Sequence, residues 1–362
     1  MSSQTVCDIL SQAVRRHHPS ARTVCIPVAD GGEGSVDAFL SAVGGERVIC
    51  RAHGPYMEGM DAFYGVLPGG TAVVEMAACA GLPLVGDDKH PELTTTYGVG
   101  ELMADAIRRG CKRIILGLGG SATNDLGAGT AAALGVRFYG ADGAEFLPTG
   151  GTLGDIASFD DSAARELLRG VEIVAMCDVD NPLYGERGAA HIFGPQKGAD
   201  AAMVRMLDGQ LRLAAATLQA AYGKDFAHIP GAGAAGGMGC GVMAFLGASL
   251  QMGIETVLDA VGFDALLDGA DIVLTGEGRL DAQTLGGKVI AGVARRAAAK
   301  DVPVVAIVGG IGEGIEPIYG RGVTAVFSIN RAPVDFSISM HQSEENLALA
   351  ADNLMRLLAA WE

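Results

Sequence analysis

The sequence predicts an α/β fold in which parallel strands are covered by helices on both faces. Runs of apolar, β-branched residues alternate with helix-like runs over most of the 362 residues. Strands that are apolar throughout and joined by helices are typical of parallel sheets buried on both faces. Apolar residues make up 49% of the chain and charged residues 19%, which is the composition of a globular protein with a sizeable core. The length is sufficient for two domains.

The expected elements follow in order along the chain. We expect strands at residues 23–28, 47–51, 61–67, 71–76, 113–118, 171–176, 271–276, 302–309 and 324–329. We expect helices at residues 4–17, 33–43, 97–109, 199–221, 287–299 and 344–361. Residues 47–76 are an exception, because they have the pattern of successive hairpins with turns at Gly59 and at 68–70. This antiparallel stretch is a candidate for a domain separate from the βα units at the two chain ends.

Charge and cysteine usage exclude several classes of protein. A net charge of −16 argues against a nucleic-acid or anionic-membrane partner, since both require a basic face. The seven cysteines contain no C-x-x-C pair, which favours buried thiols in a reducing cytosol. Residues 229–254 carry no charge but contain eight glycines and a proline, so a glycine-rich loop that leads into a buried helix is favoured over a membrane span. With no signal-peptide pattern at the start, we expect a cytoplasmic protein.

Glycine is the residue type that points to function. There are 54 glycines, and five segments place them beside a carboxylate, an amide or a cation at the end of a strand. The segments are 27–35, 117–125, 177–185 with 193–199, 230–241, and 275–288. Open α/β sheets bind ligands outside the carboxyl ends of their strands. Backbone N–H groups in a glycine turn before a helix form an anion-binding site, so we expect a phosphate-bearing ligand.

The charged side chains in these segments fit a phosphate with a divalent cation. Carboxylates lie at Asp30, Glu33, Asp125, Asp178, Asp180, Glu277 and Asp281, and cations lie at Arg187, Lys197, Arg279 and Lys288. Clustered carboxylates suit Mg²⁺, which prefers oxygen ligands and shares them with phosphates. Asp178, Asp180 and Asn181 form such a cluster directly after a strand. For Asp125 the alternative is a helix cap before the Ala-rich residues 126–135.

Other site types fit poorly. A Walker A motif, a G-x-S-x-G elbow and zinc-ligand spacing are all absent from the sequence. The segment "GAGAAG" (231–236) matches G-x-G-x-x-G, and Glu255 follows it 19 residues later. The residues before this match make a poor strand and end in a proline. A nicotinamide-dependent dehydrogenase therefore stays as an alternative.

These segments together resemble the bacterial glycerate kinase family, in the class that also serves glyoxylate and galactarate catabolism. The matching blocks are "PVADGGEGS" (27–35), "LGLGGSATNDLGAG" (116–129), "CDVDNPLYG" (177–185), "FGPQKGA" (193–199), "PGAGAAGG" (230–237) and "LTGEGRLDAQTLGGK" (274–288). They run in family order over nearly the whole chain. The resemblance implies ATP-dependent phosphorylation of D-glycerate, most often to 2-phosphoglycerate, with Mg²⁺. It also implies a Rossmann-like parallel sheet domain built from both chain ends, 1–46 and 260–362, with an inserted mixed α/β domain at 47–259.

The resemblance also suggests roles for individual residues. The expected nucleotide contacts are Gly119, Gly120, Ser121, Asn124, Asp125, Gly231, Gly233, Gly236 and Gly237. The expected substrate contacts are Asp30, Gly31, Gly32, Glu33 and Lys197. We expect Asp178 and Asp180 to hold Mg²⁺, and Arg279 to pair with the glycerate carboxylate or the transferring phosphoryl group. The catalytic base is Asp281 or Asp178. The partner is the small-molecule substrate, and the sequence leaves a homodimer open.

The beginning of the chain departs from the family pattern. Family members usually start with a short strand and a loop of the type Pro-Asp-Ser-Phe-Lys-Gly before the pair that is Ser2-Ser3 here. We therefore expect an empty sheet position beside residues 23–28, with a cost in stability and activity. An inactive, truncated paralogue is the second alternative to an active kinase.

Overall fold

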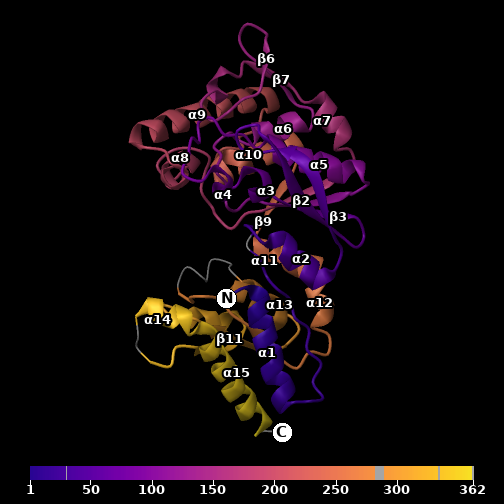
Figure 1. Cartoon of the computed structure of the whole chain (residues 1–362), viewed down its shortest axis with the longest axis vertical. Coiled ribbons are helices and arrows are strands. Elements are labelled where there is room, and N and C mark those ends of the chain that lie inside the picture. The colour runs from indigo at the N-terminus through magenta and orange to yellow at the C-terminus, as the bar shows by residue number, and fades with distance from the viewer. Residues whose placement is uncertain (30, 282–288, 333–334, 361–362) are drawn as a thin grey trace. The chain divides into compact units, whose positions relative to one another are not determined.

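The chain forms two compact units, and each is described by itself. The structure is a computed structural model that describes residues 1–29, 31–281, 289–332 and 335–360. Unit 1 comprises Met1–Ala29 and Ile254–Glu362, and unit 2 comprises Asp30–Gly253 (Figure 1). Parallel strands with helices packed on them confirm the predicted α/β class. The division differs from the predicted boundaries at residues 46 and 260, because helix α2 (Ser35–Val43) packs on strands of unit 2.

Unit 2 is built on a six-stranded mixed sheet with the order β1-β2-β3-β4-β8-β9. Its strands are β1 (Glu46–His53), β2 (Gly59–Leu67), β3 (Thr71–Glu75), β4 (Arg113–Gly117), β8 (Glu172–Met176) and β9 (Ser249–Gln251). The first three strands pair antiparallel, which confirms the predicted hairpins. From β3 onward the pairing is parallel, with Thr71 opposite Arg113. The antiparallel stretch is thus continuous with the parallel strands, because β3 belongs to both.

The helices of unit 2 connect and cover these strands. They are α2, α3 (Ala77–Ala80), α4 (Leu82–Val85), α5 (Tyr97–Arg108), α6 (Ala128–Ala133), α7 (Ser162–Leu167), α8 (Ala189–Phe193), α9 (Ala201–Tyr222) and α10 (Ala234–Leu246). Two short 3-10 helices, η1 (Leu153–Asp155) and η2 (Pro195–Lys197), complete the connections. The side chain of Asp200 caps α9 by accepting from the backbone N–H groups of Ala202 and Met203.

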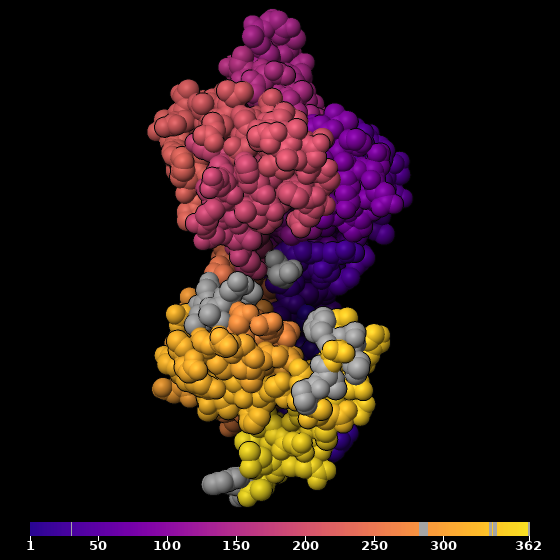
Figure 2. Space-filling model, turned by 90° about the vertical axis from the view of Figure 1, so that its left-hand side faces the viewer, coloured from indigo at the N-terminus to yellow at the C-terminus, as the bar shows by residue number. Residues whose placement is uncertain are grey.

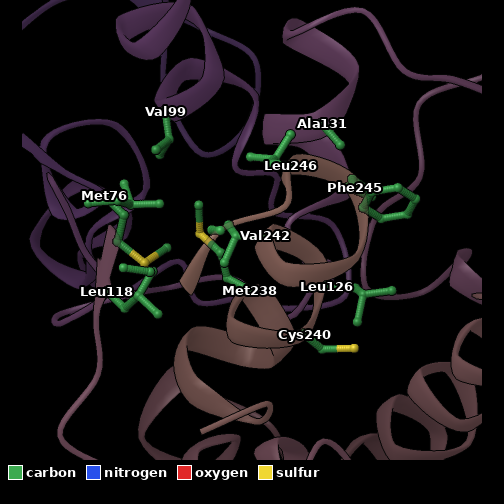
Figure 3. Packing of buried hydrophobic residues seen from close by; sticks show 14 of the residues in the cluster. Met76, Val99, Leu118, Leu126, Ala131, Met238, Cys240, Val242, Phe245 and Leu246 are labelled. Atoms are coloured by element: carbon green, nitrogen blue, oxygen red, sulfur yellow. The ribbon is translucent and has the colours of Figure 1, made fainter. Parts of the chain in front are cut away.

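The core of unit 2 is centred on α10. Figure 3 shows Met238, Val242 and Phe245 of this helix together with Leu126 and Ala131. All five side chains are buried. The chain from Ala235 to Gly237 has positive φ angles, so regular helix geometry begins only after Gly237. The predicted loop leading into a buried helix is therefore confirmed.

A small second sheet in unit 2 is absent from the sequence-based prediction. Its strands are β5 (Arg137–Tyr139), β6 (Glu145–Phe146) and β7 (Ser158–Asp160), in the order β6-β5-β7. Residues 141–144 between β5 and β6 and the first residue of β6 are exposed and lie in the magenta projection visible in Figures 1 and 2. Strands of two or three residues carry too little periodicity to be recognised from a pattern.

Unit 1 contains a three-stranded parallel sheet, β10 (Val273–Thr275), β11 (Val304–Val308) and β12 (Val323–Ser328). Val305 and Ile307 pack with residues of α1 (Ser3–His17) and α15 (Ser343–Ala359). The alternate residues of β11 face the other side, and α13 (Val289–Ala298) contacts all three strands. The remaining elements are α11 (Gly253–Ala260), α12 (Phe263–Leu266), η4 (Glu316–Arg321) and α14 (Phe336–His341).

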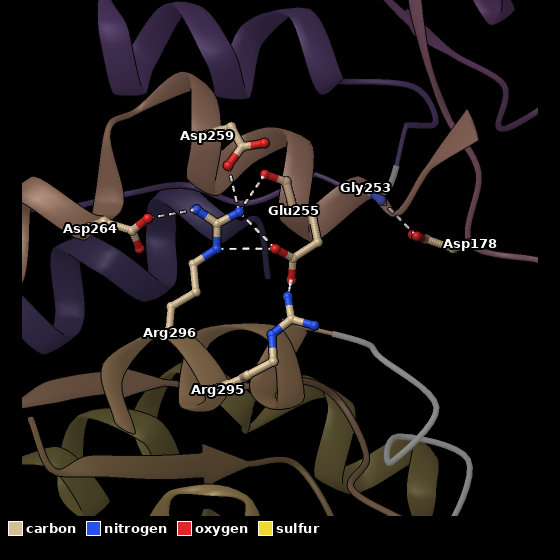
Figure 4. Close-up of polar contacts among 7 residues, drawn as sticks. All are labelled: Asp178, Gly253, Glu255, Asp259, Asp264, Arg295 and Arg296. Carbon is tan, nitrogen blue, oxygen red and sulfur yellow. Dashed lines mark hydrogen bonds and ion pairs between the residues drawn. The ribbon is translucent and has the colours of Figure 1, made fainter. Parts of the chain in front are cut away.

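A buried arginine joins three helices of unit 1. The guanidinium of Arg296 on α13 bonds Glu255 and Asp259 of α11, at 2.7 and 2.5 Å, and Asp264 of α12 at 3.4 Å (Figure 4). Its side chain is only 14% exposed. The neighbouring Arg295 also pairs with Glu255, but is 68% exposed. Arg296 is therefore the less exposed of the two arginines that pair with the acidic side chains of α11.

The strand predicted at residues 23–28 is wrong. The segment forms no ladder with any described strand. It is held by α1 instead: the Ser3 hydroxyl donates to the Val28 carbonyl at 2.6 Å, and the Ser11 and Thr23 hydroxyls are hydrogen-bonded at 3.0 Å. An apolar extended run becomes a strand only when a neighbouring strand pairs with its backbone.

Two further expectations concern helices and thiols. Among the described residues there is no helix with the length and hydropathy needed to cross a membrane. All seven cysteines are free thiols, of which Cys79, Cys111 and Cys240 are buried and the other four are partly buried.

Candidate active site

The carboxyl ends of three neighbouring strands in unit 2 carry the polar segments singled out in the sequence. Strand β3 ends at Glu75, β4 leads into residues 117–125, and β8 leads into residues 177–185. The three strands are adjacent and parallel. Because carboxyl ends of parallel strands share one edge of a sheet, these segments gather at the edge where open α/β sheets bind ligands.

The loop 117–125 has an accessible rim and a buried base. Gly119 is half-buried and Gly120 is exposed, whereas residues 121–125 are buried. Gly120 has a φ of 76°, a left-handed conformation that glycine adopts without strain. Among the expected nucleotide contacts, the buried ones in this loop are Ser121, Asn124 and Asp125. Within this loop the rim Gly119–Gly120 therefore presents backbone to solvent.

The Asp125 carboxylate is bonded inside the protein. It accepts hydrogen bonds from the Thr96 backbone N–H at 2.7 Å and from the Thr96 hydroxyl at 2.8 Å. It also accepts from the backbone N–H groups of Gly127 and Gly129, at 3.1 and 3.2 Å. Burial raises the pKa of the Asp125 carboxyl above its usual value, and these hydrogen bonds oppose the shift. The side chain thus performs the capping role that the sequence left open, at the start of α6.

Unsatisfied polar atoms and a buried cation lie at the base of the same loop. The side-chain amide nitrogen and oxygen of Asn124 and the hydroxyl of Thr123 are buried without a hydrogen-bond partner among the described residues. The ammonium of Lys197, which is 2% exposed, donates to the Thr123 carbonyl at 2.6 Å. Burial lowers the pKa of Lys197 to about 7, and the charge of Asp125 opposes the shift. Lys197 is therefore brought to the predicted loop, on its inner side.

The segment after residue 30 packs directly on the β4 loop. Asp30 itself lies outside the described residues. The Gly119 backbone N–H donates to the Gly31 carbonyl at 2.9 Å, and a Cβ on Gly117 would lie 2.4 Å from that oxygen. Gly31 is buried, Gly32 is half-buried and Glu33 is exposed. The two glycine segments are adjacent because neither carries a side chain at the contact.

Glu75, at the end of β3, is a buried carboxylate behind these loops that the sequence pattern did not single out. Its side chain is 1% exposed, and its carboxylate accepts from the Val36 backbone N–H at 2.5 Å, at the start of α2. Burial raises the pKa of Glu75. The signal in the sequence was a lone carboxylate at the end of the apolar run 71–76. Glu75 holds the helix that follows the Gly31–Gly34 turn.

Asp178 and Asp180 lie on the exposed loop after β8. The Asp178 carboxylate accepts from the Gly253 backbone N–H at 2.8 Å (Figure 4). The Asp180 carboxylate pairs with Arg187 at 3.2 Å. No group of three or more His, Cys, Asp or Glu side chains within the described ranges is arranged to hold a metal ion.

The donor set still fits Mg²⁺ held together with phosphate. Two exposed carboxylates on one loop match the way Mg²⁺ is bound in phosphoryl-transfer sites, through one or two carboxylates plus phosphate oxygens and water. The chemistry of Asp178 and Asp180 is therefore suitable, with Arg187 as the cation that balances Asp180 within the protein.

The glycines of segment 230–241 contact the other loops of unit 2. A Cβ on Gly236 would lie 2.0 Å from the Thr123 carbonyl oxygen, and one on Gly233 would lie 2.2 Å from the Pro182 carbonyl oxygen. A Cβ on Gly231 would lie 2.8 Å from the Cys177 sulfur. These three glycines and Gly237 are buried. Segment 230–241 thus packs against both the loop after β4 and the loop after β8.

The G-x-G-x-x-G match at 231–236 lacks the context of a dinucleotide site. No strand leads into it, since residues 223–233 form turns after α9. The dinucleotide fingerprint requires a strand immediately before the first glycine. The geometry therefore speaks against the dehydrogenase alternative.

Arg279 and Asp281 lie in unit 1, after β10. Their side chains pair at 3.4 Å, with Arg279 73% exposed and Asp281 29% exposed. Between them, Leu280 is buried and its backbone bonds Gly310 and Gly312 in the segment after β11. The rest of this predicted segment, 282–288, lies outside the described residues. The pair is held at the carboxyl edge of the parallel sheet of unit 1.

Comparison with known proteins gives a consistent result over the full length. The family model described as "Glycerate kinase family" matches residues 1–359. A Bacillus cereus protein named glycerate kinase is 45% identical over 359 residues, which are 99% of this chain and 93% of that protein. An Escherichia coli protein named glycerate 2-kinase is 40% identical, over 99% of this chain and 95% of its own length.

A solved structure supports the same assignment. A crystal structure of a candidate glycerate kinase 2 from Salmonella typhimurium LT2 superimposes with a TM-score of 0.87 at 40% sequence identity. The match covers 99% of this chain and 95% of the other. With the family model matching almost every residue, the chain belongs to the glycerate kinase family.

Proposed function

We propose that this chain transfers the terminal phosphoryl group of ATP to D-glycerate and forms 2-phosphoglycerate. The observation that carries the proposal is the meeting of the glycine segments 31–34, 117–125, 177–185 and 230–241 at one edge of the unit 2 sheet. Such an edge is where α/β sheets bind ligands, and a glycine rim favours an anionic one. Membership of the glycerate kinase family supports the reaction type. The E. coli relative named glycerate 2-kinase supports the position of transfer.

The proposal assigns anion binding to backbone groups. The rim Gly119–Gly120 is accessible, and the segment Gly31–Glu33 lies against it. Phosphoryl transfer requires mainly positioning and neutralisation of charge, which N–H groups and a few cations supply. The glycines of 230–241 support these loops from within.

Arg279 and Asp281 are the proposed reactive side chains of unit 1. A guanidinium binds a carboxylate or a phosphoryl group through two parallel hydrogen bonds, so Arg279 is assigned to the glycerate carboxylate or the transferring group. A carboxylate accepts the hydroxyl proton, and Asp281 or Asp178 fills that role. Their pairing at 3.4 Å keeps Arg279 and Asp281 within reach of one small substrate.

We assign Mg²⁺ to Asp178 and Asp180. When bound, the ion would neutralise charge on the phosphates. The Asp178 carboxylate bonds Gly253, which fixes its direction at the end of β8. Asp180 would exchange its pairing with Arg187 for the ion.

The proposal includes a cytoplasmic location and leaves the homodimer open. Seven free thiols fit a reducing compartment. Light scattering of the purified chain decides between a monomer and a dimer.

The direct test combines a product assay with one variant. The purified chain is incubated with D-glycerate and Mg·ATP, and ³¹P NMR separates 2-phosphoglycerate from 3-phosphoglycerate. We expect 2-phosphoglycerate with one ADP per product. Arg279→Ala should lower kcat/KM for glycerate by about 100-fold or more, as lost charge stabilisation does, while the exposed Arg331→Ala is the matched control in unit 1. Near-native kcat/KM in Arg279→Ala would remove Arg279 from the site, and formation of 3-phosphoglycerate would correct the position of transfer.

A further inference from the structure

Lys197 is the most deeply buried cation near the candidate site. It closes the 3-10 helix η2, and only 2% of the residue is exposed. Its ammonium donates to the backbone carbonyl of Thr123 at 2.6 Å. The charged group that acts on it is Asp125, which is fully buried two residues further along the same loop. The lysine thus faces the inside of the loop 117–125.

Turns on both sides of Lys197 in the sequence hold it in its buried position. Before it, the Gly194 N–H donates to the Ala190 carbonyl at 3.0 Å, and the Lys197 N–H donates to the Gly194 carbonyl at 2.9 Å. After it, Gly198 has a φ of 99°. A Cβ on Gly198 would lie 2.5 Å from the Lys89 Cβ, so this turn is packed closely against another segment. The direction of the Lys197 side chain is therefore set by a rigid turn rather than by a flexible surface loop.

The side chains of Thr123 and Asn124 do not themselves anchor the base of the loop. The Thr123 hydroxyl and the Asn124 amide make no hydrogen bond within the described part of the chain. The Thr123 carbonyl is also the atom that a Cβ at Gly236 would strike at 2.0 Å. The Thr123 carbonyl itself therefore has two contacts, the backbone of the glycine segment and the ammonium of Lys197, while its neighbours Ala122 and Asp125 are held by other hydrogen bonds.

We propose that Lys197 is a positioning residue that holds the loop 117–125 through the Thr123 carbonyl, and does not contact substrate. The rim Gly119–Gly120 is continuous with this base, so movement of Thr123 displaces the backbone that binds the anion. This inference rests on the proposed function for its kinetic consequence, whereas the anchoring of the loop does not depend on it. It replaces the expectation that Lys197 binds glycerate directly.

The test uses Lys197→Met, which keeps an unbranched side chain one heavy atom shorter and removes the charge and the donors. Lys224→Met is the control, because Lys224 is exposed in the same unit. Amide hydrogen exchange followed by mass spectrometry reports on peptides that cover residues 117–126. In Lys197→Met we expect exchange there to be faster by about tenfold or more, because local opening controls the rate. Exchange in β1 and β2 should stay as in the control.

Kinetics separate positioning from substrate contact. In Lys197→Met we expect kcat to fall by about tenfold or more with a change in the KM for D-glycerate below about threefold. Unchanged exchange in 117–126 together with a tenfold rise in that KM would overturn the proposal in favour of direct binding. Unchanged exchange with unchanged kinetics would overturn it as well.

A second variant covers the case in which Lys197→Met fails to fold. Lys197→Gln keeps an N–H donor near the Thr123 carbonyl, so its exchange in 117–126 should lie between wild type and a fully opened loop. The proposal that Lys197 anchors the loop would be contradicted by a folded Lys197→Gln variant that exchanges 117–126 at the wild-type rate and has a tenfold higher KM for D-glycerate. A wild-type chain without kinase activity would refute the proposed function, while the exchange comparison would still decide the role of Lys197.

Discussion

Asp125 and Thr96 are joined by two hydrogen bonds, from the Thr96 backbone at 2.7 Å and from its hydroxyl at 2.8 Å. Thr96 precedes α5, and Asp125 precedes α6. The Thr96 hydroxyl also accepts from the Thr130 backbone N–H at 2.9 Å. The pair therefore connects the starts of two helices behind the candidate anion loop, with every polar atom of the contact buried.

Asp125→Ala should destabilise the protein strongly. The substitution leaves four buried donors without their acceptor and removes the carboxylate whose charge acts on Lys197. We expect the free energy of unfolding to fall by about 3 kcal/mol or more. Urea unfolding followed by circular dichroism measures the loss. Asp142→Ala, in the exposed stretch 141–145, is the control and should change the free energy of unfolding by less than about 1 kcal/mol. Equal losses in the two variants would contradict a structural role for Asp125.

Gly236→Ala should be far more damaging than Gly247→Ala. Both glycines have left-handed φ angles, 68° and 66°. A Cβ at Gly236 would lie 2.0 Å from the Thr123 carbonyl oxygen, whereas at Gly247 no atom lies within 4 Å. Gly247→Ala should cost about 1 kcal/mol for the backbone conformation alone. Gly236→Ala should cost several times more or prevent folding. A similar thermal shift for the two variants would show that the close approach to Thr123 does not exist.

The stability of the protein should rise with pH through the titration of Lys197. Burial lowers the pKa of Lys197 to about 7 in the folded chain, whereas an unfolded lysine titrates near pH 10. Between about pH 7 and 10 the unfolded chain thus binds more protons than the folded chain, so the free energy of unfolding increases with pH. The free energy of unfolding is measured with urea at each pH for wild type and for Lys197→Met. The difference between the two isolates the contribution of Lys197, because groups that titrate alike in both chains cancel. A difference that is flat over this range would contradict the lowering of the Lys197 pKa by burial.

Arg296→Met should destabilise unit 1 more than Arg295→Met. Arg296 is 14% exposed and bonds three carboxylates, of which Glu255 is 16% exposed and would keep only its pairing with the exposed Arg295. Arg295 is 68% exposed, and a pair of that kind contributes little. We expect the free energy of unfolding to fall by about 3 kcal/mol in Arg296→Met and by less than about 1 kcal/mol in Arg295→Met. Thermal unfolding of the two variants makes the comparison, and an equal shift would show that burial of Arg296 is not what stabilises the three helices.

Much of the fold could be predicted because its strands are long and apolar. The runs 113–118 and 302–309 became β4 and β11, and the hairpins of 47–76 were found from their turns. The run 23–28 has the same composition and is not a strand, because strand formation depends on a partner that local sequence does not reveal. The boundary at residue 46 differs for a similar reason, since packing decides which unit holds α2.

The candidate site was predictable as segments but not as individual contacts. Glycine and charge marked the β4 and β8 loops, and the structure brings them together. Which atoms face outward depends on burial, so Asn124, Asp125 and Lys197 lie on the inner side although the pattern treats them like Gly120. Glu75 was not predicted, because a single carboxylate at the end of a strand is not part of a recognisable motif.

The most direct measurement is amide hydrogen exchange of the wild-type chain with and without ligands. The protein is saturated with D-glycerate, Mg²⁺ and a non-hydrolysable ATP analogue, and binding is verified by calorimetry. The account predicts slower exchange in peptides covering 117–121 and 275–281, by about tenfold or more, because bound anions occupy those backbone and side-chain groups. Unchanged exchange at 117–121 in a chain that demonstrably binds both ligands would contradict it.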